Sequence, residues 1–153
     1  MYKRILIAVD GSQTSVKALN AALRLAHEGE GRVRIIHVVE ELIYLASYNE
    51  FGGHSGEIAT ALHEAGVKIV QDALAIADAA GVEADTKLVD HFGARLGESM
   101  ADEAKHWDAD LIVVGTHGRR GIGRMFLGSG AEQVVRLAPV HALVVRNCEH
   151  SST

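Results

Sequence analysis

The sequence of 153 residues predicts an α/β fold, namely a doubly wound, five-stranded parallel sheet in the order 3-2-1-4-5 with helices on both faces. Short apolar runs alternate strictly with segments in which apolar residues recur every three or four positions. The strand segments are almost continuously apolar, which is typical of a sheet covered on both faces. Right-handed crossovers leave few strand orders, and the doubly wound one reverses direction between strands one and four.

The first two strands and the helix between them have clear boundaries. The apolar run at 3–9 (KRILIAV) ends in turn residues at 10–12 (DGS) and predicts the first strand. Apolar residues then recur at helical spacing from Ser15 until Gly29 interrupts the pattern, which predicts the first helix. The β-branched run at 33–39 (VRIIHVV) predicts the second strand.

The middle of the chain repeats this alternation. A stretch from Glu40 to Gly56 has no clear period and is expected to be a surface loop. A long helix is expected between Ile58 and Ala77, because apolar residues recur there at helical spacing. The third strand is expected at about 84–90.

The last third of the chain contains the segment most typical of a strand. A shorter helix at 96–104 precedes this strand, which covers 110–115 (DLIVVG) and leads into a glycine-rich loop. A fourth helix is expected to begin near Ser129 and to end at Pro139, since proline disfavours helical conformation in the residue before it. The fifth strand is then expected at 141–146.

Composition and charge bound the compartment and the partners. The net charge of -5 disfavours nonspecific attraction to nucleic acid or to anionic membranes. The apolar runs are far shorter than the roughly 18 residues that span a bilayer, and the start of the chain has no signal-peptide pattern. A lone cysteine, Cys148, fits a reducing compartment. We therefore expect a cytoplasmic protein with no nucleic-acid or membrane partner, one domain at 1–148 and a polar tail at 149–153.

The stretch GTHGRRGIGRMFLGSG at 115–130 directly follows the fourth strand and predicts a phosphate-binding loop. Gly115, Gly118 and Gly128 are expected to adopt positive φ angles and to let backbone amides approach an anion without obstruction by a Cβ atom. The fourth helix begins where this loop ends, so its unpaired N–H groups and its positive dipole end should face the same space.

Serine and arginine side chains in this stretch have both structural and binding interpretations. Ser129 and Glu132 match a capping box, so Ser129 is expected to cap the fourth helix while its backbone N–H serves a phosphate. Arg119, Arg120 and Arg124 form a local basic patch, although each arginine taken singly is expected to be a solvated loop charge.

Asp10 lies at the end of the first strand, across the predicted switch point from the glycine-rich loop. Its carboxylate could accept hydrogen bonds from a base amino group or a ribose hydroxyl, or it could cap the first helix or start the Asp-Gly turn. His37, in the second strand, is expected in the core or at the sheet edge. His54 and His63 are too far apart to present a metal site on one helical face.

Together these residues resemble the universal stress protein family. Gly115-x-x-Gly118, nine further residues and Gly128-Ser129 match its nucleotide motif, while ILIAVDGS and APVHALVVR resemble its first and last strands. The resemblance covers essentially the whole chain and implies a Rossmann-like, adenine nucleotide alpha hydrolase-like fold that binds ATP, AMP or ADP. The positions that the resemblance and the loop argument assign to nucleotide binding are Ala8, Val9, Asp10, Val38, Gly115, Thr116, His117, Gly118, Arg119, Arg120, Gly121, Gly128, Ser129 and Gly130. Gly130 stands where the family usually has an apolar residue.

The expected function is a nucleotide-binding, regulatory stress-response module, with a slow ATP hydrolase as the alternative. No Walker-type lysine is present in the sequence, and hydrolysis needs a positioned water and usually Mg²⁺, which is a candidate companion of the nucleotide. Phosphoacceptor signalling would need an acidic pair beside Asp10, which the sequence lacks. A flavin carrier would depend on Tyr44, Tyr48 and Phe51, which are expected to pack the loop or a partner.

The last predicted strand also predicts how the protein assembles. In the order 3-2-1-4-5, residues 141–146 (HALVVR) form an apolar edge strand with unpaired backbone groups. Two copies can pair such edges antiparallel about a two-fold axis, in agreement with the dimers that the family resemblance implies. A homodimer through this strand is expected. No pattern in the sequence indicates which downstream protein it would bind.

Overall fold

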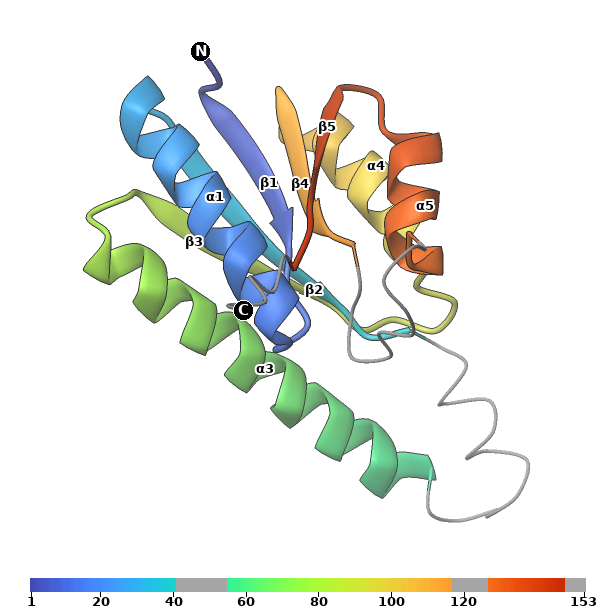
Figure 1. Ribbon diagram of the computed structural model, residues 1–153. Helices are drawn as coiled ribbons and strands as arrows, with labels where there is room; N and C mark the ends of the chain where they lie inside the picture. Colours follow the sequence, from blue (N-terminus) through green and yellow to red (C-terminus); the bar gives the residue numbers. More distant parts are fainter. Residues whose placement is uncertain (41–54, 117–126, 148–153) are drawn as a thin grey trace, which may run out of the picture.

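The computed structural model of the protein describes residues 1–40, 55–116 and 127–147 and contains the predicted sheet (Figure 1). Five strands, all parallel, lie in the order β3-β2-β1-β4-β5. The strands are β1 (Arg4–Ala8), β2 (Arg32–Val38), β3 (Ala84–Val89), β4 (Leu111–Gly115) and β5 (His141–Val145). The helices are α1 (Gln13–Gly29), α3 (Ser55–Ala79), α4 (Leu96–His106) and α5 (Ser129–Leu137). The doubly wound order predicted from the sequence is confirmed.

The helices cover the two faces of the sheet in pairs, α1 with α3 and α4 with α5 (Figure 1). Successive residues of a strand point to opposite faces, so β1 contributes Ile5 and Ile7 to one core and Leu6 to the other. All three side chains are fully buried. This double burial explains why β1 and β4, in the middle of the sheet, are nearly continuous apolar runs.

Two helices begin earlier than the apolar periodicity predicts. The first begins at Gln13 instead of Ser15, because the Ser12 hydroxyl accepts a hydrogen bond from the Ser15 amide at 3.2 Å and caps the helix. Helix α3 begins at Ser55, three residues before the first apolar residue of its pattern. Apolar periodicity locates only the buried stripe of a helix. A first turn without a buried apolar residue therefore cannot be recognised from this periodicity.

A charged cluster fixes α4 to β2 and β3. Glu103 on α4 is 4% exposed, and its carboxylate accepts hydrogen bonds from Arg34 Nη1 at 2.7 Å and from Lys87 Nζ. Arg34 also makes a bidentate pair with Asp85, at 2.7 and 2.8 Å, and its guanidinium lies over the Trp107 ring, 4.7 Å from the centroid. No local sequence pattern predicts this cluster, because its members come from three separate elements.

The cluster keeps Glu103 ionised. Burial raises the pKa of Glu103, but the hydrogen bonds from Lys87 and Arg34 outweigh burial and lower the pKa below its ordinary value. The hydrogen bond to Asp85 in turn raises the pKa of Arg34. Glu103 is therefore a buried carboxylate whose charge is matched by two cations, which anchors the middle of α4 on the sheet.

Candidate functional site

The carboxyl ends of β1 and β4 lie side by side and form the switch point of the sheet. Ile7 is the register partner of Val113, so Val9, directly after β1, lies level with Gly115 at the end of β4. From this point the chain enters α1 on one face and reaches α5 on the other (Figure 1). Doubly wound folds hold their ligands in the crevice outside such strand ends.

Asp10 shapes the β1 side of this crevice. Its Oδ1 accepts a hydrogen bond from the Ser12 amide at 2.9 Å, across a turn in which Gly11 has a φ angle of 82°. That angle lies in the left-handed region that favours glycine. Ser12 caps α1, so of the two structural roles expected for Asp10 the turn is confirmed and the helix cap is wrong.

One hydrogen bond brings the two ends of the glycine-rich stretch together on the β4 side. The Gly128 amide donates to the Thr116 carbonyl at 2.7 Å, and the Thr116 amide donates to Val145 of β5 at 2.9 Å. Thr116 is 5% exposed. The first turn of α5 therefore lies directly against the carboxyl end of β4, although eleven residues separate Thr116 from Gly128 in the sequence.

The prediction that Gly115 and Gly128 adopt positive φ angles is wrong. Gly115 ends β4, and Gly128 has φ -59° and ψ 152°, which any residue adopts. Gly115 serves close packing instead, because a Cβ atom there would lie 2.8 Å from Thr14 Cγ2 of α1. The missing side chain lets α1 approach the end of β4, and Thr14, which no sequence pattern indicates, fills that space.

The prediction of a capping box at the start of α5 is also wrong. Gly128 is the N-cap residue, Ser129 is the first helical residue, and the Glu132 amide donates to the Gly128 carbonyl at 2.9 Å. The Glu132 carboxylate pairs with Arg136 at 2.9 Å along the helix instead of returning to the helix start. The amides of residues 129–131 precede the first intrahelical hydrogen bond, so they are the donors that an anion would meet.

The remaining assigned residues of the β1 and β2 ends are buried and can offer mainly backbone to a ligand. The three are Ala8, Val9 and Val38, each at most 9% exposed. The Val9 carbonyl accepts a hydrogen bond from His37 Nδ1 at 2.8 Å, which fixes the proton on that nitrogen and ties β1 to β2. His37 is half-buried in an inner strand, so it lies neither in the core nor at the sheet edge where it was expected.

Several predicted residues lie outside the described part of the chain. They are His117, Gly118, Arg119, Arg120, Gly121 and Arg124 of the loop, together with Tyr44, Tyr48, Phe51, His54 and Cys148. Within the described ranges, no group of three or more His, Cys, Asp or Glu side chains could hold a metal ion. The helices in those ranges also include none with the length and apolar character of a membrane span.

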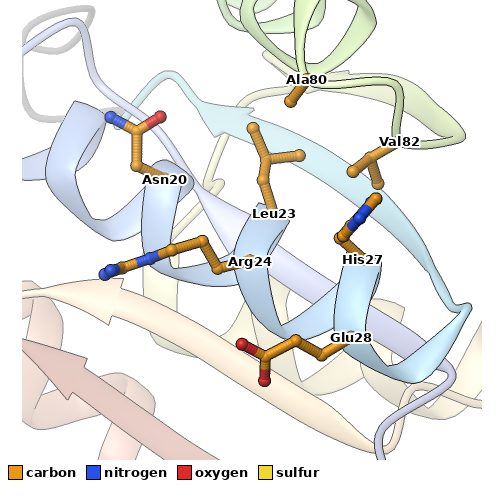
Figure 2. Close-up of a pocket in the computed structure, with 7 residues that line it drawn as sticks. All are labelled: Asn20, Leu23, Arg24, His27, Glu28, Ala80 and Val82. Carbon is orange, nitrogen blue, oxygen red and sulfur yellow. The ribbon is translucent and has the colours of Figure 1, made fainter.

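A groove of about 540 Å³ lies away from the switch point, between α1 and the turn that enters β3 (Figure 2). Its lining residues are Asn20, Leu23, Arg24, His27, Glu28, Ala80 and Val82. His27 is in the last turn of α1 and Val82 precedes β3, so the groove opens at the amino ends of the strands. The glycine-rich motif and Asp10 both lie at the opposite edge, which therefore remains the candidate site.

The fold and the switch-point site define the class of doubly wound α/β proteins that bind ligands at strand ends. The chain belongs to the universal stress protein family, whose model matches residues 1–146. It is 32% identical over 156 residues to the universal stress protein YxiE of Bacillus subtilis, covering 95% of this chain and 100% of the relative.

Solved structures of the family share the fold. A universal stress protein family member from Burkholderia pseudomallei has a TM-score of 0.74 at 31% identity, covering 94% of this chain and 95% of that one. A universal stress protein solved in complex with cAMP has a TM-score of 0.64 at 24% identity, covering 94% and 96% of the two chains. One from Archaeoglobus fulgidus, in complex with dAMP, has a TM-score of 0.65 at 21% identity, covering 94% and 98%.

Proposed function

We propose that this protein is a regulatory stress-response module that binds an adenine nucleotide, ATP in particular, across the carboxyl ends of β1 and β4. The observation that carries the proposal is the Gly128–Thr116 hydrogen bond, which sets the first turn of α5 against the end of β4. Family relatives of the same fold in complex with cAMP and dAMP support an adenine ligand. A cytoplasmic location, where ATP is abundant, fits this function.

The phosphates lie at the start of α5 in this proposal. The amides of Ser129 and Gly130 point out of the helix start, where the helix dipole places a positive potential of roughly half an elementary charge. The exposed Ser129 side chain adds a hydroxyl donor. These are uncharged, fixed donors that suit a nucleotide phosphate, and any Mg²⁺ would arrive bound to that phosphate.

The base and ribose lie toward β1 and β2. The half-buried Asp10 carboxylate stands at the end of β1, and the Val38 backbone ends the next strand, about 4.8 Å away. A carboxylate accepts a hydrogen bond from the adenine amino group, whereas it faces the acceptor oxygen of guanine unfavourably. Asp10 therefore selects adenine over guanine.

The protein forms a homodimer through β5, which is the second half of the proposal. The two edges of the sheet differ, since β3 carries the charged residues Asp85 and Lys87 whereas β5 (HALVV) carries no acidic residue and no lysine or arginine. Charged residues protect an edge strand from pairing with another chain, and an apolar edge lacks that protection. Leu143 of β5 is an exposed apolar side chain, and the exposed Val135 and Leu137 of the adjoining α5 extend the apolar surface.

Nucleotide binding can be tested by calorimetric titration with ATP. We expect a micromolar dissociation constant, equivalent to about -8 kcal/mol at 1 μM. Gly128→Val should weaken binding at least about tenfold, because a branched side chain at the N-cap crowds the amides that meet the phosphate. Gly56→Val is the matched control, since a Cβ atom at Gly56 meets nothing within 4 Å. Equal ATP affinity of Gly128→Val and the parent would contradict the phosphate assignment.

Base selection can be tested by competition between ATP and GTP. Asp10→Asn keeps an acceptor for the Ser12 amide and so preserves the turn, but it replaces one carboxylate oxygen by a donor. We expect the preference for ATP over GTP to fall about tenfold, in line with one altered hydrogen bond to a ligand. Asp10→Ala should lose the same preference and also the turn. An unchanged ATP:GTP ratio in both variants would leave Asp10 with its turn role alone.

A further inference from the structure

We propose that Gly97 is a positioning residue for the nucleotide: because it lacks a Cβ atom, α4 can seat α5 where the α5 amides meet the phosphate. This inference rests on the nucleotide site proposed above and assigns a role to a residue outside that site. Gly97 lies in the first turn of α4 and is buried. It contacts a different helix from the one that carries it, so its effect on a ligand would be indirect.

The contact between Gly97 and α5 leaves no space for a side chain. A Cβ atom on Gly97 would lie 2.7 Å from Gln133 Cβ, 3.0 Å from Gln133 C and 3.1 Å from Gln133 O. Real Cβ atoms essentially never approach other atoms more closely than 3.0 Å. Two of these atoms belong to the α5 backbone, so no rotamer change relieves the clash and one helix must move.

A second close contact lies one turn nearer the start of α5. A Cβ atom on Gly130 would lie 2.9 Å from Leu96 Cδ2, so the Leu96 side chain occupies the space that a larger residue at 130 would need. Gly130 and Gln133 are three residues apart and share a face of α5. The first turn of α4 thus contacts the part of α5 that carries the proposed phosphate donors, and Leu96 accounts for the unusual Gly130.

The displaced helix would be α5. Helix α4 is held by Met100 and Ala104, which are 0% and 1% exposed, and by the charged pairs of Glu103. Helix α5 has nine residues, of which Ala131 and Val134 are buried. A methyl group at position 97 would therefore push α5 away from α4 and shift its amides relative to the end of β4.

The test compares ATP with adenosine, which lacks the phosphates. In Gly97→Ala we expect ATP to bind about tenfold more weakly, because displaced donors lose hydrogen bonds to a charged group. Adenosine binding should stay within about twofold of the parent, since it does not use α5. The matched control is Gly29→Ala on α1, where the new Cβ atom would lie 2.7 Å from the Tyr2 carbonyl oxygen, at the opposite edge of the sheet from the proposed site. That variant should bind both ligands as the parent does.

The outcomes separate this inference from the proposed function. A parent protein that binds no ATP refutes the nucleotide site itself. A parent that binds ATP, together with a folded Gly97→Ala variant whose ATP:adenosine affinity ratio is unchanged, overturns the role of Gly97 alone. Equal weakening of both ligands also overturns it, because such a loss reflects general damage to the fold.

A second pair of variants decides the question if Gly97→Ala does not fold. Gly130→Ala creates a contact with the flexible Leu96 tip, so it should weaken ATP by about threefold while preserving the helix. Adding Leu96→Ala should restore the parent's affinity, because the space for the new methyl group returns. Failure of Leu96→Ala to restore ATP binding means that the methyl group obstructs the ligand directly, which overturns positioning by α4.

Discussion

Val144→Pro is expected to convert the proposed dimer to a monomer and to raise its dissociation constant about a thousandfold, roughly 4 kcal/mol. The Val145 carbonyl faces β4, since it accepts the hydrogen bond of the Thr116 amide. Backbone groups alternate along a strand, so the N–H and C=O of Val144 face the open edge. Proline at 144 removes a donor needed for pairing with a second copy and leaves the hydrogen bonds to β4 in place.

Two controls isolate the backbone donor as the cause. Val144→Ala removes the same side-chain contacts but keeps the N–H, so it should remain a dimer. Thr86→Pro makes the same backbone change on the opposite edge of the sheet. The Val39 amide donates to the Val89 carbonyl, so the odd-numbered residues of β3 face β2 and the N–H of Thr86 faces the open edge. Light scattering after size-exclusion chromatography measures the mass. A parent protein that is monomeric at tens of micromolar, a concentration typical of weak association, would reject the β5 interface.

Arg34→Leu is expected to lower the free energy of unfolding by about 3 kcal/mol at neutral pH, because it leaves the Glu103 carboxylate buried with one cation fewer. The guanidinium also loses its contact with the Trp107 ring. For a chain of this size the melting temperature should fall by about 10 °C. Arg24→Leu on α1 is the control at a position with no such pair among the described residues. A loss below about 1 kcal/mol, the range of exposed ion pairs, would show that the cluster adds little.

The same variant should change how stability depends on pH. In the parent, the pKa of Glu103 is lower in the folded state than in the unfolded state. The contribution of Glu103 to stability is therefore present above the unfolded-state pKa and is lost as the pH falls through the folded-state pKa. Without Arg34, burial is opposed by Lys87 alone and the pKa rises. The stability difference between parent and variant should therefore be largest above about pH 5 and should shrink in acid. Urea unfolding at several pH values measures it, and a constant difference would contradict the linkage to Glu103.

The sheet order could be predicted because strands buried on both faces are recognisable in the sequence as short apolar runs. Apart from Arg4, the runs that form β1 and β4 have no polar side chain, and this pattern together with right-handed crossovers allows few topologies. Features that depend on contacts across the fold could not be predicted. Gly115 has the sequence context of a phosphate-loop glycine, yet the nearest obstacle to a Cβ atom there is Thr14, 101 positions earlier in the chain.

The start of α5 shows a second limit of sequence patterns. Ser129 and Glu132 have the spacing of a capping box, but a glycine directly before the serine takes the N-cap conformation instead. The pattern fixes the helix start to within one residue, and the choice of cap depends on the backbone of Gly128, which the Thr116 carbonyl holds. Asp10 is a similar case, since its residue type also suits a helix cap but Ser12, two residues later, provides the cap of α1.

The hydrogen bond between Gly128 and Thr116 also links the end of β4 to the start of α5 through main-chain atoms alone. The Gly128 amide nitrogen lies 2.7 Å from the Thr116 carbonyl oxygen, and every residue except proline supplies such an amide. Side chains at these two positions can therefore change in evolution while the sheet and the helix stay joined.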